Sequence, residues 1–168
     1  MSTQITRRVW LTVGLISLFI AVILASFIHR VQQPRVMSQS EMRANGLFLF
    51  ETPRDPGDFS LIDHNGEPFT PDDLEGNWTL LFFGFTNCPD ICPTTLSFLA
   101  NLNQQLETTE VADTRVVMVS VDPARDTVEA LASYVPYFDP SFTGVTGEFL
   151  DILKFARSFN ATFRKVTA

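Results

Sequence analysis

The chain has 168 residues, of which 45% are hydrophobic and 18% charged, and a formal net charge of −7. This length allows one globular domain of ordinary size plus a short extra segment. Residues 51–168 carry seven basic and 18 acidic side chains, a formal charge of −11, which argues against a nucleic acid partner because that binding depends on Lys and Arg side chains that neutralise phosphates.

The first predicted element is a membrane helix. Residues 9–28 contain 20 residues without a charged side chain, about the length that crosses the hydrocarbon core of a bilayer. A cleaved signal peptide is the alternative, but its apolar region spans only about 7–15 residues and ends at a small-residue site, which residues 26–29 do not resemble. Arg7 and Arg8 precede the helix, and such positive charge tends to stay in the cytoplasm.

We therefore expect a retained single-pass anchor over residues 9–28, with residues 1–8 in the cytoplasm. The anchor begins too close to Met1 to leave room for an organellar transit peptide, which indicates a bacterial protein. The expected location is the bacterial inner (cytoplasmic) membrane, with the globular domain facing the periplasm. Residues 29–44 are mostly polar and predict a linker, and His29 is interpreted as an interfacial residue rather than a ligand.

A hairpin is predicted after the linker. Residues 59–62 and 67–70 read as two short strands, and the Asn65-Gly66 pair between them is the strongest short-range hairpin signal. His64 lies in this turn. We interpret it as a solvated turn residue rather than a metal ligand, because nothing nearby in the sequence converges on it.

The next elements predict a βαβ unit. Residues 79–85 and 116–121 are almost continuously apolar, which is typical of strands in a parallel sheet that is covered on both faces. Between them, leucines recur at helical spacing at positions 96, 99, 102 and 106. Two more helices are predicted over residues 126–135 and 147–159, and residues 161–168 resemble the start of another strand. The fold class is therefore α/β.

The only two cysteines, Cys88 and Cys92, stand in the run GFTNCPDICP directly after the first of these strands. Proline suits the first helical position, so we predict that the helix begins at Pro93, with Cys92 at or near the N-cap and Cys88 in the loop. Unpaired amide donors at a helix start favour thiolate over thiol. Both sulfur atoms are expected to be partly exposed and reactive.

Three interpretations of this pair remain open. A structural disulfide would close so short a ring that it removes less chain entropy than the ~3 kcal/mol expected for a 15-residue loop. A redox-active dithiol fits the position, although such enzymes commonly have two intervening residues rather than three. A metal site would use two soft thiolates, which select copper(I) or zinc, and would need at least one further ligand.

Acidic residues surround the predicted site. Asp90, between the cysteines, either caps the helix or tunes the thiolates. Asp122, Arg125 and Asp126 follow the second buried strand at its carboxyl end, where ligand sites of open α/β sheets gather. For these three residues, a local ion pair that fixes the turn is the favoured interpretation.

Three stretches of the sequence resemble motifs of the Sco/SenC family. Residues 84–96, GFTNCPDICPTTL, are similar to its signature, residues 120–127, SVDPARDT, to a second motif, and residues 138–147, FDPSFTGVTG, to a third. The resemblance extends over roughly residues 45–168. It implies a thioredoxin-like domain there, with a βαβ core and parallel central strands.

The resemblance also implies a function. Members of the family bind a copper ion through the two cysteines of the signature, here Cys88 and Cys92, and assist assembly of the binuclear copper centre of cytochrome c oxidase. The implied partner is the copper-binding subunit of the oxidase. The alternative is a thiol–disulfide oxidoreductase in which the same pair, forming a disulfide when oxidised, reduces the cysteines of the oxidase copper site. Peroxidase activity is not expected, because Leu81 and Phe85 occupy the Pro and Thr places of the peroxiredoxin pattern.

The family's third copper ligand has no counterpart in this sequence. It is a histidine in an Asp-His-Ser stretch beyond the region where this chain ends, and no histidine follows His64 here. The resemblance thus implies that the domain lacks its C-terminal strands and last helix. We expect a truncated domain whose sheet has an exposed edge beside the cysteine loop.

Overall fold

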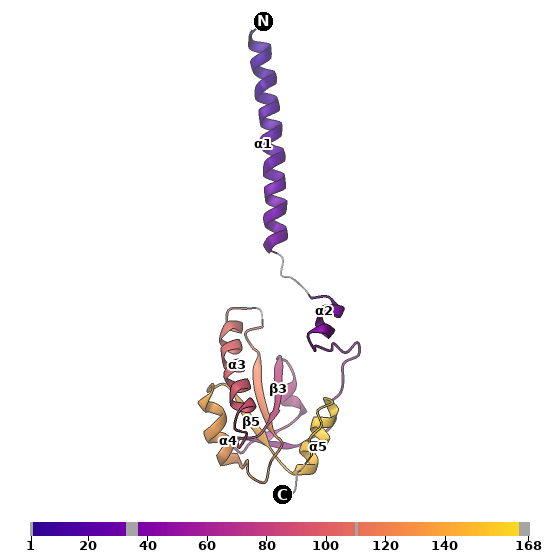
Figure 1. Ribbon diagram of the computed structural model, residues 1–168, viewed down its shortest axis with the longest axis vertical. Helices are drawn as coiled ribbons and strands as arrows, with labels where there is room; N and C mark the ends of the chain where they lie inside the picture. The colour runs from indigo at the N-terminus through magenta and orange to yellow at the C-terminus, as the bar shows by residue number, and fades with distance from the viewer. Residues whose placement is uncertain (1, 33–36, 110, 165–168) are drawn as a thin grey trace. The chain divides into compact units, whose positions relative to one another are not determined.

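The computed structural model describes residues 2–32, 37–109 and 111–164. The chain divides into two compact units, Met1–Glu51 and Thr52–Ala168. In the first unit, α1 is one continuous helix (Figure 1), and the short α2 follows it; their bounds are Ser2–Gln32 and Gln39–Ala44. Over the part of the chain that the structure describes, α1 is the one helix long and apolar enough to cross a membrane, with a mean hydropathy of 2.7 over Trp10–Val31. The predicted helix is confirmed, while its role as an anchor stays a prediction.

The second unit contains a five-stranded mixed sheet with the order β2-β1-β5-β4-β3. β1 pairs antiparallel with both β2 and β5, whereas β4 pairs in parallel with β5 on one side and β3 on the other. The strand bounds are β1 Leu61–Asp63, β2 Pro68–Phe69, β3 Thr79–Gly84, β4 Arg115–Ser120 and β5 Thr143–Thr146. Among the described strands, β3 pairs with β4 alone, so the expected edge beside the cysteine loop is present.

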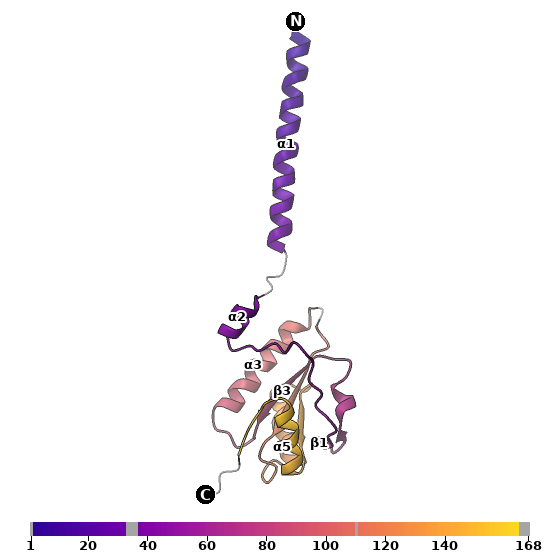
Figure 2. The same ribbon diagram turned by 90° about the vertical axis from the view of Figure 1, so that its right-hand side faces the viewer.

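Helices cover both faces of this sheet, as Figures 1 and 2 show. Their bounds are α3 Ile91–Leu106, α4 Val128–Tyr134 and α5 Phe149–Ser158. Leu96 of α3 and Leu131 of α4 pack with Val116 and Met118 of β4 on one face. Ile152 and Phe155 of α5 belong to a second core cluster on the other face. The predicted α/β fold with a βαβ unit is confirmed.

The strands and helices predicted from apolar patterns match the structure, but β5 and the predicted C-terminal strand do not. β5 was not predicted as a strand, because its four residues, TGVT, include a glycine and two threonines and give no apolar run. The strand predicted over residues 161–168 is wrong for residues 161–164, which have no regular structure, and residues 165–168 lie outside the described residues.

His64 has a structural role that its place in the β1–β2 turn does not reveal. Gly66 takes a φ of +85° in this turn, a conformation that glycine adopts without strain. Next to it, His64 Nδ1 accepts a hydrogen bond of 3.0 Å from the backbone N–H of Gly144 in β5. The interpretation of His64 as a solvated turn residue is therefore wrong, because its imidazole connects the β1–β2 hairpin to β5 through this hydrogen bond.

Replacing His64 with alanine is expected to lower the free energy of unfolding by about 1–3 kcal/mol, because the N–H of Gly144, a buried residue, loses its acceptor. Urea unfolding of the full chain in detergent, followed by circular dichroism, measures this loss. Glu67→Ala in the same turn is the control, since an exposed side chain there changes stability by no more than about 0.5 kcal/mol. Equal stabilities for the two variants would contradict this role of His64.

Candidate functional site

The candidate site is the loop that joins β3 to α3. β3 ends at Gly84 and α3 begins at Ile91, so Cys88 lies in the loop and Cys92 in the first turn of the helix. The prediction that the helix begins at Pro93 is wrong by two residues. The reason is that the first four N–H groups of a helix have no partner within it, so a proline without an N–H fits anywhere in the first turn.

Asp90 takes the N-cap position of α3, but its side chain makes no capping hydrogen bond. The predicted N-cap position of Asp90 is therefore confirmed, but the capping hydrogen bond from its side chain is absent. The backbone of Asp90 instead contributes an N–H that points at the Cys88 sulfur, as described below.

Both cysteine side chains are nearly buried, contrary to the expectation of partial exposure. Cys88 is 9% exposed and Cys92 is 4% exposed, and both are free thiols. Gly84 makes room for Cys92. A Cβ atom on Gly84 would lie 3.3 Å from the Cys92 Sγ and 2.7 Å from the Phe82 ring. The sulfur of Cys92 thus lies against the end of β3, where a Cβ atom would clash with the Phe82 ring and crowd the sulfur.

The two thiols differ in acidity because hydrogen bonds have the largest effect on the pKa of Cys88, whereas burial has the largest effect on that of Cys92. Hydrogen bonds from the thiol and the backbone N–H of Cys92 lower the pKa of Cys88, and the N–H groups of Asp90 and Ile91 add to this effect. Burial raises the pKa of Cys92 to about 11, helped by its hydrogen bond to Cys88 and by the charge of Asp126. The prediction that the helix start favours thiolate therefore holds for Cys88 and fails for Cys92.

We expect iodoacetamide to alkylate Cys88 at least about tenfold faster than Cys92 at pH 8, because the thiolate is the nucleophile and one pKa unit changes its fraction about tenfold. Cys92 stays mostly protonated until the pH approaches its pKa of about 11, so its alkylation is expected to become fast only in strongly alkaline solution. Peptide mass spectrometry of the reduced full chain measures both rates. Because the two side chains are similarly buried, equal rates would contradict the difference in acidity.

A buried carboxylate fixes the cysteine loop. Asp126 is 0% exposed. It accepts hydrogen bonds from the Thr86 hydroxyl at 2.6 Å, the Thr86 N–H at 3.0 Å and the Ser120 hydroxyl at 2.6 Å. Thr86 lies two residues before Cys88, and Ser120 ends β4. Asp126 therefore ties the loop to the neighbouring strand, a role that the sequence analysis did not assign.

The predicted ion pair after β4 involves only two of the three expected residues. Arg125 donates to the carboxylate of Asp122 and forms a salt bridge with it, while Asp126 faces inward. The cap of α4 is the neighbouring Thr127, whose hydroxyl accepts from the N–H of Ala130 at 3.3 Å. The favoured interpretation is confirmed for Asp122 and Arg125 and wrong for Asp126.

Within the second unit, His64 does not join the cysteines in a ligand cluster. His64 Nδ1 is occupied by Gly144, and His29 belongs to α1 of the first unit. Across residues 2–32, 37–109 and 111–164, no group of three or more His, Cys, Asp or Glu side chains is arranged to hold a metal ion. Cys88 and Cys92 are the soft donors that the structure brings together.

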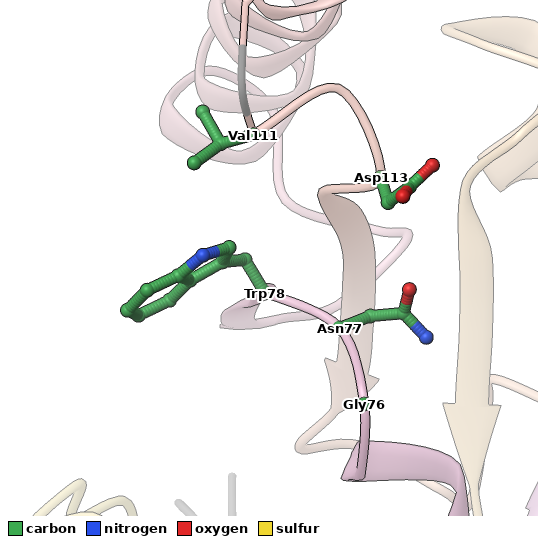
Figure 3. A pocket seen from close by; sticks show the side chains of 5 residues that line it. All are labelled: Gly76, Asn77, Trp78, Val111 and Asp113. Atoms are coloured by element: carbon green, nitrogen blue, oxygen red, sulfur yellow. The ribbon is translucent and has the colours of Figure 1, made fainter.

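Two hollows mark the opposite ends of the parallel strands. One, of about 660 Å³, lies at the carboxyl ends of β3 and β4 and is lined in part by Phe85, Val121 and Arg125. The other, of about 450 Å³, lies where β3 and β4 begin; Figure 3 shows Trp78 and Val111 on one side of it. The cysteine loop follows β3, so the candidate site belongs to the first end, where ligand sites of open α/β sheets gather.

Comparison with known proteins gives related sequences and structures. The family model for SCO1/SenC matches residues 51–168. The chain is 43% identical over 110 residues to SCO2-like protein RC0895 of Rickettsia conorii. The aligned region covers 66% of this chain and 53% of that protein. This chain therefore spans about half the length of the curated relatives it matches.

Two solved structures extend the comparison. The crystal structure of Arabidopsis thaliana ScoI with copper bound is 44% identical with a TM-score of 0.59, over 62% of this chain and 65% of that one. The second is BsSco, a member of the Sco family of cytochrome c oxidase assembly proteins in which a disulfide switch was identified. It is 27% identical with a TM-score of 0.58, over 67% of this chain and 68% of that one. These matches agree with the thioredoxin-like α/β fold, and the chain belongs to the SCO1/SenC family.

Proposed function

We propose that this chain is a membrane-anchored copper carrier that binds copper(I) through Cys88 and Cys92 and assists assembly of the binuclear copper centre of cytochrome c oxidase. The observation that carries the proposal is the pair of free, hydrogen-bonded thiols at the β3–α3 loop. Two soft sulfur donors suit copper(I). The copper-bound ScoI of Arabidopsis, with the same fold, supports copper as the cargo.

The unequal thiols support an ordered uptake. Cys88, with the lowered pKa, is the sulfur that offers a thiolate first. Cys92 then loses its proton to solvent as it binds the metal, so copper(I) uptake is accompanied by proton release from the pair. Release to a partner reverses this order, with the partner's ligands replacing one sulfur at a time. The copper-binding subunit of the oxidase is the proposed recipient, supported by the description of BsSco as an oxidase assembly protein.

The proposed domain organisation follows from α1 and the family match. Residues 1–8 face the cytoplasm, residues 9–28 cross the membrane, residues 29–44 form a linker, and residues 45–168 form the Sco domain in the periplasm. The apolar stretch Trp10–Val31 supports the anchor. Protease treatment of spheroplasts that degrades the domain while sparing a cytoplasmic marker would support this orientation.

The proposal is tested by anaerobic titration of the full chain in detergent with copper(I) in competition with a colorimetric chelator. The wild type is expected to take up one copper(I) per chain, and the double variant Cys88→Ser/Cys92→Ser none above background. Equal weak binding by both proteins would contradict the proposal.

A second candidate function uses the same sulfurs in thiol–disulfide exchange with the oxidase copper site. It is favoured by the unequal pKa values of the pair, since a thiolate of lowered pKa beside a second thiol is the arrangement of exchange-active pairs, and by the disulfide switch of BsSco. A reduction potential of roughly −120 to −270 mV in glutathione buffers would support it. A potential far below this range would indicate an inert disulfide.

A further inference from the structure

The chain that follows α1 contains an exposed apolar run. Leu47, Phe48 and Leu49 are 53%, 72% and 68% exposed, and they occupy consecutive positions without regular secondary structure. Single exposed apolar side chains are common on soluble proteins, whereas three large ones in a row are unfavourable in water unless another surface covers them. This apolar run, residues 47–49, therefore has the character of a binding segment.

The local structure of α2 places the start of the apolar run. The capping box of Ser38 and Glu41 fixes the first turn of this helix. At the other end, Gly46 takes a φ of +79°, and the backbone N–H of Leu47 donates a hydrogen bond of 2.8 Å to the carbonyl oxygen of Met42. This hydrogen bond is the one that closes a Schellman motif. The run thus begins at a defined helix end.

The charge of the surrounding residues indicates which surface the apolar run fits. Residues 29–50 carry three arginines and one glutamate, a formal charge of +2, whereas residues 51–168 carry −11. Basic side chains beside exposed leucine and phenylalanine are typical of segments that bind anionic membranes, since the cations meet lipid phosphates while the apolar groups enter the headgroup region. The same lipids repel the acidic second unit.

The position of the apolar run along the chain favours the bilayer of the proposed anchor. Val31 ends the apolar stretch of α1, and Leu47 lies 16 residues after it. A run tethered this closely meets the bilayer in an intramolecular step, at a high effective concentration. A short apolar run can therefore bind there although it would bind weakly as a free peptide.

We propose that residues 47–49 bind the surface of the anionic bilayer that α1 crosses, with their side chains in the headgroup region. This inference rests on the proposed membrane anchor. Because the second unit begins at Thr52, binding of the apolar run also keeps the start of that unit close to the membrane.

The inference is tested by quenching of tryptophan emission by brominated lipids, with the full chain reconstituted in vesicles of phosphatidylglycerol and phosphatidylcholine. Trp10 and Trp78 are the only tryptophans, so three variants each carry one indole. Trp78→Phe reports on α1, and Trp10→Phe reports on the second unit. The triple variant Trp10→Phe/Trp78→Phe/Phe48→Trp reports on the apolar run. All three substituted positions are exposed, so each variant is expected to keep the fold.

Brominated lipid is expected to quench most of the emission of Trp78→Phe and of the triple variant, and to leave that of Trp10→Phe nearly unchanged. Adding Leu47→Asn and Leu49→Asn to the triple variant is expected to abolish its quenching, because the apolar contact with lipid is lost. Vesicles of phosphatidylcholine alone are expected to give weaker quenching of the triple variant, because the arginines lose their anionic partners.

The outcomes separate the inference from the anchor on which it rests. Quenching of Trp78→Phe without quenching of the triple variant overturns the inference alone. If Trp78→Phe is not quenched either, α1 does not cross the bilayer, and the anchor fails together with the inference. Equal quenching of Trp10→Phe and the triple variant also contradicts the inference, since the second unit would then lie at the bilayer as closely as the run. Equal quenching of the triple variant in both kinds of vesicle overturns the anionic surface as the partner.

Discussion

Replacing Asp126 with alanine is expected to lower the free energy of unfolding by at least about 3 kcal/mol. Three donors, the hydroxyl and N–H of Thr86 and the hydroxyl of Ser120, would lose the carboxylate that they share. Each buried donor left unpaired costs about 1–3 kcal/mol. Urea unfolding of the full chain in detergent measures the loss, and the cysteine loop is expected to be the region whose amide hydrogen exchange increases most.

Asp122→Ala is the matched control for Asp126→Ala. Asp122 lies four residues earlier, and its salt bridge with Arg125 is at the surface, where the Arg125 side chain is 57% exposed. Such surface pairs are worth no more than about 1 kcal/mol. A loss of stability in Asp126→Ala no larger than in Asp122→Ala would contradict the buried role of Asp126.

Asp126→Asn gives a second test that bears on the site. The asparagine retains one oxygen acceptor and removes the negative charge that helps to raise the pKa of Cys92. The pKa of Cys92 is therefore expected to fall in this variant, and its alkylation at a given pH to become faster. Unchanged alkylation in a folded Asp126→Asn protein would show that the carboxylate does not act on the sulfur.

Each single substitution, Cys88→Ser or Cys92→Ser, is expected to lower copper(I) affinity by more than about 100-fold. Loss of an outer-shell partner alone reaches this figure, and here a soft sulfur ligand is replaced by a hard hydroxyl. Chelator competition measures the affinity of each variant. Thr94→Ser, on the exposed side of the first turns of α3, is the control that keeps both sulfurs. Wild-type affinity in either cysteine variant would show that the pair does not act together.

The sequence predicted the strands and helices of the layered fold because residues buried in the core recur at regular spacing along the chain. The apolar runs that became β3 and β4, and Leu96 and Leu99 of the leucine spacing in α3, mark residues that pack in the two core clusters. β5 escaped prediction because its place between β1 and β4 is set by long-range pairing, while its own residues give no pattern. The short α2 was also missed, although Ser38 and Glu41 form the reciprocal hydrogen bonds of a capping box.

The candidate site was predictable in its residues and less so in its environment. Cys88 and Cys92 were identified from their spacing and from the motif around them, but their near burial was not, because it comes from tertiary packing such as the close approach of the Cys92 sulfur to Gly84. Asp126 was not identified as the residue that holds the cysteine loop through Thr86. It lies 34 residues from Cys92, and no local pattern in the sequence predicts a contact made through tertiary packing.

The most direct test of the account is X-ray absorption at the copper edge of the full chain loaded anaerobically with one copper(I). The account predicts that two sulfur atoms are bound to the metal in the wild type, that one remains in Cys88→Ser or Cys92→Ser, and that none remains in the double variant. A first coordination shell made only of nitrogen or oxygen in the wild type, or one that is identical in the wild type and the double variant, would contradict the claim that Cys88 and Cys92 hold copper.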